Sequence, residues 1–224
     1  MPRELFHQEL AEVQKEILVM GSMVEKATLD ALESLRTGDL EWSQRIVDDD
    51  SAIDQKRYEI EEKTIFIVAS QQPMATDLRT LISALYIITD LERMADHAEG
   101  IARINLLLGN ETELPRELGY IPTMGELAIT MLRDSLKAYI ESDINEARRI
   151  CDADDEVDRL QDAVYAESFE SMIADNSTIQ DNTYRLWTAH NFERIADRCT
   201  NICERVIFIV TGSMTEATRG VSKY

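Results

Sequence analysis

Residues 90–96 read Asp-Leu-Glu-Arg-Met-Ala-Asp, and residues 191–197 read Asn-Phe-Glu-Arg-Ile-Ala-Asp. Each copy places a glutamate and an aspartate four residues apart, Glu92 with Asp96 and Glu193 with Asp197. On a helix, side chains at this spacing lie on one face, so each pair can share a cation. Such pairs arise by chance in a chain with 43 acidic residues among 224, and the duplication is what gives them weight.

The duplication extends over the whole chain. A shift of 104 residues aligns Met20-Gly21 with Met124-Gly125 and Asp39 with Asp143, and the match continues without a gap through the acidic segment 48–54. After a deletion of three residues the offset becomes 101, and residues 85–101 align with residues 186–202. The chain is therefore a tandem repeat of one unit of roughly a hundred residues.

Composition favours helix throughout. Only 8 glycines and 4 prolines occur, and aromatic residues are 6% of the chain, whereas good helix formers dominate. Apolar spacing and chain breakers predict helices over residues 3–36, 39–70, 74–108, 124–141, 143–174 and 178–211. We expect an all-α fold of two tandem three-helix bundles, in residues 1–110 and 123–212, with a linker at 111–122 and a tail at 213–224.

The net charge of −20 argues against nucleic acid as a partner, because phosphate backbones are bound by clustered Lys and Arg. A solvated surface or an adaptation to salt could account for much of this acid. The sequence contains no apolar run long enough to span a bilayer and no signal peptide, which predicts a cytoplasmic protein. Cys151, Cys199 and Cys203 lack CxxC spacing, and we expect reduced thiols in the core.

The predicted turns bring the acidic pairs together. A hairpin turn at Pro73 places Asp50 and Asp54 level with Glu92 and Asp96. A turn at residues 175–176 does the same in the second half. The resulting predicted metal ligands are Asp50, Asp54, Glu92, Asp96, Asp154, Asp158, Glu193 and Asp197. All are carboxylates, which favours hard cations such as iron, manganese, magnesium or calcium, with zinc or nickel left open. A metal-free network of salt bridges through Arg93 and Arg194 is the alternative.

The segments 71–79 and 90–98 resemble the first-repeat signature of the PhoU family, and 190–197 with 201–202 and 210–212 resemble the second. The likeness covers essentially the whole chain. It implies repeats that are three-helix bundles and that bind multinuclear metal clusters, with iron as the first choice, through carboxylate pairs at this spacing. It also implies a non-catalytic negative regulator of phosphate uptake and of phosphate-starvation signalling.

The resemblance implies partners as well. These are the ATPase subunit of the phosphate transporter and a sensor histidine kinase, so contact with the membrane would be only through partners. Self-association into a homo-oligomer stays open. Members of the family commonly carry His directly after the motif Asp and Asn four residues after that Asp. The first repeat has His97 but Gly100 in place of Asn, and the second has Asn201 but Arg198 in place of His. We therefore expect the two sites to differ in affinity and metal choice.

Two other classes of protein remain as alternatives. A carboxylate-bridged di-iron enzyme needs Glu-x-x-His on core helices, and Glu4 with His7 near the N-terminus is the one pair that has this spacing. A purely mechanical helical scaffold would bind no metal. Metal analysis of protein purified without added metal or chelator would separate these readings.

Overall fold

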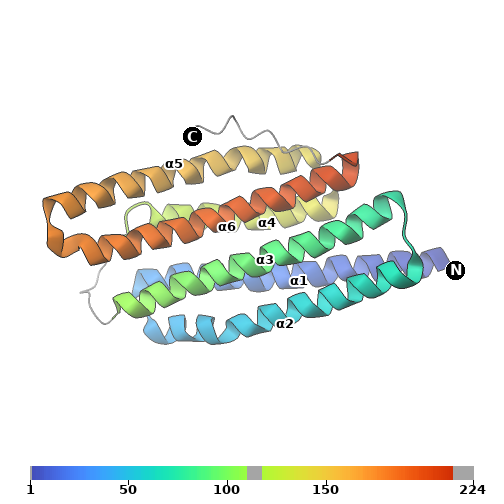
Figure 1. The fold of residues 1–224 in the computed structure, drawn as a ribbon, viewed down its shortest axis with the longest axis horizontal. Helices are drawn as coiled ribbons and strands as arrows, with labels where there is room; N and C mark the ends of the chain where they lie inside the picture. Colours follow the sequence, from blue (N-terminus) through green and yellow to red (C-terminus); the bar gives the residue numbers. More distant parts are fainter. Residues whose placement is uncertain (1, 110–117, 214–224) are drawn as a thin grey trace.

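The protein folds into six long helices aligned along one axis (Figure 1), in a computed structural model that describes residues 2–109 and 118–213. The helices are α1 (Pro2–Thr37), α2 (Leu40–Gln71), α3 (Ala75–Leu108), α4 (Ile121–Glu141), α5 (Ile144–Ala174) and α6 (Ile179–Thr211), with a short 3-10 helix η1 (Asn176–Thr178) before α6. No strand occurs in these two described ranges. The predicted all-α fold is confirmed.

An aspartate caps the start of the second helix in each half, α2 and α5. The Asp39 side chain accepts a hydrogen bond from Trp42 N at 2.8 Å, and Asp143 accepts one from Asn145 N at 2.9 Å. Both are N-caps, which satisfy backbone donors that a helix start leaves open. The predicted start of α4 at residue 124 was wrong, because the helix begins at Ile121. Pro122 fits the first turn, where its missing N–H costs no hydrogen bond.

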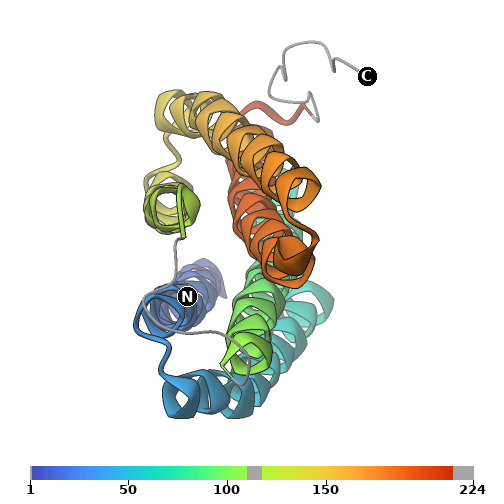
Figure 2. The same ribbon diagram turned by 90° about the vertical axis from the view of Figure 1, so that its left-hand side faces the viewer.

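Each half forms one bundle, and the two bundles share a core. Helices α1–α3 pack together, as do α4–α6, and the halves meet where α3 lies beside α6 and α1 beside α4 (Figure 2). The buried apolar side chains of both halves form a single contiguous cluster. We therefore expect the two repeats to unfold together although their sequences are duplicated.

The contact between α1 and α4 is reciprocal. A Cβ added to Gly21 would overlap Leu136, and one added to Gly125 would lie 3.0 Å from Leu32 Cδ2. The internal repeat relates Gly21 to Gly125 and Leu32 to Leu136. Gly21 on α1 thus faces Leu136 on α4, and the equivalent Gly125 on α4 faces the equivalent Leu32 on α1. An approximate twofold axis between the halves produces such a pair of equivalent contacts.

The α3–α6 contact obeys the same rule. Asp90 lies 3.7 Å from Arg198 Nη1, and its repeat-mate Asn191 lies 2.9 Å from His97 Nδ1. His97 is in turn the repeat-mate of Arg198. Both helix pairs therefore support one pseudo-twofold axis that runs between the bundles.

Gly125 offers a direct test of the α1–α4 contact. Replacing Gly125 with Val should lower the free energy of unfolding by about 1–3 kcal/mol, because the added methyl groups would press on Leu32 and Phe192. Glu126→Val is the control, since the neighbouring side chain is exposed. Chemical denaturation measures both variants, and equal stability of the two would contradict the close approach.

Most of the predicted linker and nearly all of the predicted tail lie outside the described residues. In the described part of the chain, no helix combines the length and apolar character needed to cross a membrane.

Candidate metal centres

The first acidic cluster lies where α2 faces α3. Its members are Asp50 and Asp54 on α2 and Glu92, Asp96 and Glu99 on α3. Burial raises the pKa of Asp50 to about 6, and the negative charges of Glu99 and Asp96 add to the effect. Burial also raises the pKa of Glu92 and of Asp96, again with help from neighbouring carboxylates. The cluster therefore holds more negative charge than its surroundings readily accommodate.

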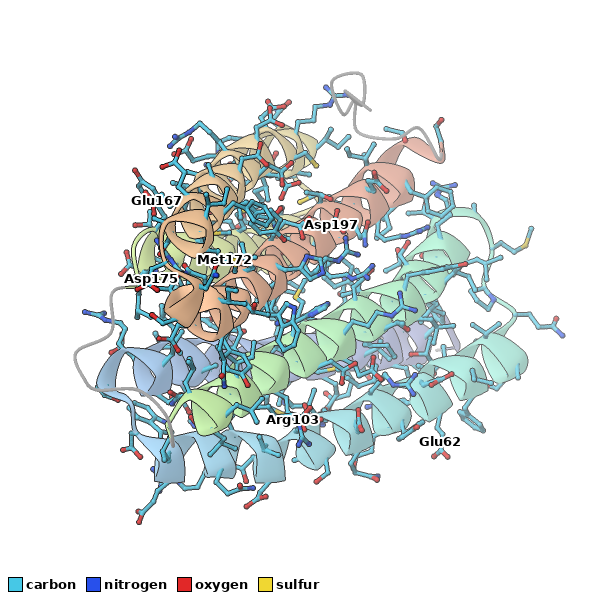
Figure 3. The ribbon with its side chains drawn as sticks, turned by 60° about the vertical axis from the view of Figure 1, so that its left-hand side comes forward. Glu62, Arg103, Glu167, Met172, Asp175 and Asp197 are labelled. Atoms are coloured by element: carbon cyan, nitrogen blue, oxygen red, sulfur yellow. The ribbon has the colours of Figure 1, made fainter. Side chains whose placement is uncertain are left out.

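Two arginines partly balance the first cluster. Arg57 Nε lies 3.8 Å from Glu92, and Arg103 donates a hydrogen bond of 2.6 Å to Glu99. Figure 3 labels Arg103 between α3 and α2. No ion pair within 4.0 Å is found for Asp50, Asp54 or Asp96 among the described residues, so three carboxylates remain for a cation.

Glu99 belongs to this cluster although the carboxylate pairs did not predict it. Its negative charge raises the pKa of Asp50, as do the charges of Asp96, Asp54 and Glu92. The signal was in the spacing, because Glu99 follows Glu92 by seven residues and Asp96 by three, on one helix face. Its repeat-mate is Thr200, so the second half has no fifth carboxylate at this place.

The second acidic cluster lies where α5 faces α6. Burial raises the pKa of Glu193, and the charges of Asp197 and Asp158 act in the same direction against the opposing charge of Arg194. Arg194 forms an ion pair of 3.0 Å with Asp197, which Figure 3 labels on α6. The structure thus brings Asp158, Glu193 and Asp197 together, as predicted from the hairpin register.

The two clusters differ in their neutral and charged neighbours. Gln161, a neutral side chain that lowers the pKa of Glu193, takes the place that Arg57 holds near Glu92 in the first half. Asp154, the fourth predicted ligand, lies near Cys199, since its charge adds to burial in raising the pKa of that thiol. The second cluster therefore extends toward Cys199 at Asp154, and each cluster has one exposed aspartate, Asp96 or Asp158.

The donor set fits hard cations in its chemistry but is not arranged around one ion. All predicted ligands offer carboxylate oxygen, and their crowding favours any cation that relieves it. Among the described residues, however, no three His, Cys, Asp or Glu side chains converge closely enough to hold a metal ion. For a metal ion to bind, the carboxylate side chains would have to turn toward one another. In the second cluster, the ion pair between Arg194 and Asp197 would also have to break. Metal binding stays a prediction.

The remaining candidate residues are the three cysteines, the three histidines and Glu4. Cys199 and Cys203 are buried free thiols, while Cys151 is only half-buried. His190 lies 3.5 Å from Glu193, and His97 faces Asn191. Glu4 and His7 are both exposed on the first turns of α1 and not on a core face, where a di-iron site would need them.

A pH test follows from the crowding around Asp50. The pKa is raised in the folded state from an ordinary value of 3.8 to about 6, so folding favours the protonated form. The contribution of protonated Asp50 to the free energy of unfolding is complete below about pH 4 and is lost as pH rises through 6. In chelator-treated protein, Asp50→Asn should add about 1 kcal/mol of stability at pH 7–8, a value reduced for partial exposure, and nothing at pH 4.

Asp49→Asn is the matched control for this test, because it removes the same charge from the exposed neighbouring position. Urea denaturation across the pH range measures both variants. An equal gain from the two variants would show that general charge reduction, and not the cluster, sets the stability.

Comparison with known proteins places the chain in a family. The PhoU domain model matches it twice, over residues 17–104 and 121–206. The phosphate-specific transport system accessory protein PhoU homolog of Clostridium acetobutylicum is 37% identical over 219 residues, covering 96% of this chain and 99% of that protein. The PhoU protein of Escherichia coli K12 is 33% identical, covering 92% and 86% of the two chains.

Solved structures agree with the sequence matches. The crystal structure of PhoU from Pseudomonas aeruginosa superposes with a TM-score of 0.88 at 34% identity and covers 93% of this chain and all of that one. PhoU from Streptococcus pneumoniae gives a TM-score of 0.87 at 33% identity, covering 94% and 99%. With both repeats matched and nearly the full length covered, this chain belongs to the PhoU family.

Proposed function

We propose that this protein is an accessory regulator of phosphate uptake that acts by docking and carries out no chemistry of its own. The observation that carries the proposal is the match, over nearly the whole of both chains, to proteins named as accessory proteins of phosphate-specific transport systems. A relationship of this extent retains both repeats and the interface between them. The docking surfaces of such a protein would therefore be present in this chain.

The partners in this proposal are the ATPase subunit of the phosphate transporter and the cognate sensor histidine kinase. Docking in the cytoplasm restrains uptake and holds the phosphate-starvation response off while phosphate is plentiful. The exposed face formed by α2, α3, α6 and α5 is supported as a docking face by its charge, since both acidic clusters lie along it. Opposite charges on a partner would steer and orient the encounter.

Metal binding is the second part of the proposal. The eight predicted carboxylates hold cations, iron before manganese, magnesium, calcium, zinc or nickel, and Glu99 joins them in the first half. Support comes from the raised pKa values of Asp50, Glu92 and Glu193, because each records a carboxylate whose negative charge is disfavoured. Bound cations would remove that penalty and stabilise the folded state by mass action.

A metal-free scaffold is the competing candidate. The ion pairs of Arg57 with Glu92 and of Arg194 with Asp197 favour it, since they already neutralise one carboxylate in each cluster. Elemental analysis of protein purified without added metal or chelator separates the two. Docking would still operate in a metal-free protein.

A deletion strain tests the regulatory role. Without this protein, phosphate-starvation genes should stay switched on in phosphate-replete cells, and the intact chain supplied on a plasmid should restore repression. Co-purification with the transporter ATPase or the sensor kinase tests the docking step separately. Normal repression and normal phosphate uptake in the deletion strain, with neither partner recovered, would refute the proposal.

A further inference from the structure

Four arginines gather along the line where α3 meets α6, in a chain whose net charge is −20. We call this line the seam strip, and its members are Arg93 on α3, Arg194, Arg198 and Arg205 on α6, and the aromatic side chains Tyr86 and Trp187. Nitrogen-tipped side chains are visible between α6 and α3 in Figure 3. A basic strip in so acidic a protein calls for a physical account.

Asp90 is the internal anchor of the strip. Its side chain is buried, accepts a hydrogen bond of 3.1 Å from Asn201 and lies 3.7 Å from Arg198. The charges of Arg93 and Arg205 also act on it, which places three arginines around one carboxylate. One buried carboxylate therefore lies within reach of three of the four arginines.

The strip retains positive charge toward water. Arg93 is exposed, and among the described residues it makes no ion pair within 4.0 Å. The guanidinium of Arg205 stacks on the Tyr86 ring at 4.1 Å. Arg194 is shared between Asp197 and the strip, since its charge also acts on His97. Arginines held in this way lose little entropy on meeting an anion.

Exposed aromatic residues stand at both ends of the strip. Tyr86 is 50% exposed and Trp187 is 52% exposed, and the internal repeat relates the two. Contacts pair Tyr86 with Arg205 and His97 with Asn191, so α3 and α6 run antiparallel. At 1.5 Å of rise per residue, the two aromatic side chains lie roughly 24 Å apart along the seam. Trp, Tyr and Arg are the residue types that dominate binding energy at protein interfaces.

The surroundings of the strip restrict what can cover it. The first acidic cluster flanks it on the α2 side and the second on the α5 side, so positive charge is confined to the seam itself. A membrane surface or a nucleic acid would bring its negative charge against both clusters as well. A single acidic segment laid along the seam would keep its negative charge closer to the arginines than to the clusters.

We infer that the seam strip is a docking surface for one acidic segment of a partner protein, with apolar side chains at the segment's ends over Tyr86 and Trp187. A length of roughly 24 Å corresponds to about seven residues of extended chain. This inference goes beyond the proposed function by naming the surface and the chemistry of the partner. It does not depend on which partner protein carries the segment.

The test uses the full-length protein and a fluorescein-labelled oligoglutamate peptide with a leucine at each end. Fluorescence anisotropy should show binding that weakens as salt increases, because the contact is between charges. Charge reversal by Arg93→Glu together with Arg194→Glu should weaken binding by about tenfold or more. Arg148→Glu with Arg159→Glu is the matched control, since it changes the net charge equally at exposed positions on α5 and should leave binding within about twofold.

A second pair of substitutions tests the aromatic ends of the seam strip. Tyr86→Ala with Trp187→Ala should weaken peptide binding without reducing its salt dependence, and circular dichroism verifies that every variant is folded. No peptide binding at low salt, an equal loss in the control, or tighter binding to vesicles of anionic phospholipid than to the peptide would each overturn the inference. A failure here leaves the deletion phenotype intact, so the two proposals fail separately.

Discussion

Replacing Phe192 with Ala should lower the free energy of unfolding by about 3–5 kcal/mol, the largest stability effect that we expect from one core substitution. The Phe192 ring is fully buried on α6 and also faces Gly125 on α4. Its loss would leave a cavity in the shared core that long, mutually packed helices cannot easily close. Thermal denaturation should show a drop of roughly 6–20 °C in Tm.

The shape of that transition is part of the expected result. Because one apolar cluster runs through both bundles, the variant should unfold in a single step like the parent protein. The control is Phe169→Ala, which removes the same ring from an exposed position on α5 and should change stability little. Two separate transitions in either protein would show that the bundles fold independently and would contradict a shared core.

The sequence predicted the helices well because local signals were present at nearly every boundary. Helices were expected to begin at Asp39 and Asp143, and both residues are the N-caps of those helices. The glycine at 38 has a positive φ at the end of α1. The start of α4 was misplaced because Pro122 was interpreted as part of the linker, although proline is equally compatible with a first helical turn. Local chemistry alone does not separate those two roles.

The sequence could predict which carboxylates lie near each other only for two helices that are joined by a short turn. The turn at Pro73 fixed which helices face each other, but it did not single out Glu99, whose charge also acts on Asp50. Counting residues from a turn does not determine the exact register of the two helices. The salt bridge of Arg194 was among the sequence-based alternatives, but that of Arg57 was not, because spacing does not determine side-chain direction.

The contact between the two halves had no signal within either repeat. Duplication predicts two similar bundles and suggests a pseudo-twofold relation, but it does not say which helices meet. That α3 lies against α6 follows from packing of faces that are apolar on more than one side. The seam strip arises from this contact, because Asp90 and Arg198 are more than a hundred residues apart in the sequence. Surfaces built between repeats of this kind can be found only in the folded chain.

Replacing Glu92 with Gln and Asp96 with Asn should remove metal from the first half of the protein and leave the second half loaded. Losing two charged ligands should reduce metal affinity there by more than about 100-fold. Removing a residue that only hydrogen-bonds to a metal ligand already lowers metal affinity by about 10–100-fold. The converse variant, Glu193→Gln with Asp197→Asn, should spare the first half. Elemental analysis after equilibration with iron measures the metal content of each.

The matched control is Glu59→Gln with Glu62→Gln, which removes two charges from exposed positions on α2. Figure 3 labels Glu62 on α2, away from the α3 side of that helix. If general acidity attracts the metal, the control and the cluster variants will lose equal amounts; if the clusters hold it, only the cluster variants will. Unchanged metal content in both cluster variants would exclude these carboxylates as ligands. The ion pairs of Arg57 and Arg194 would then be the permanent means by which the clusters are neutralised.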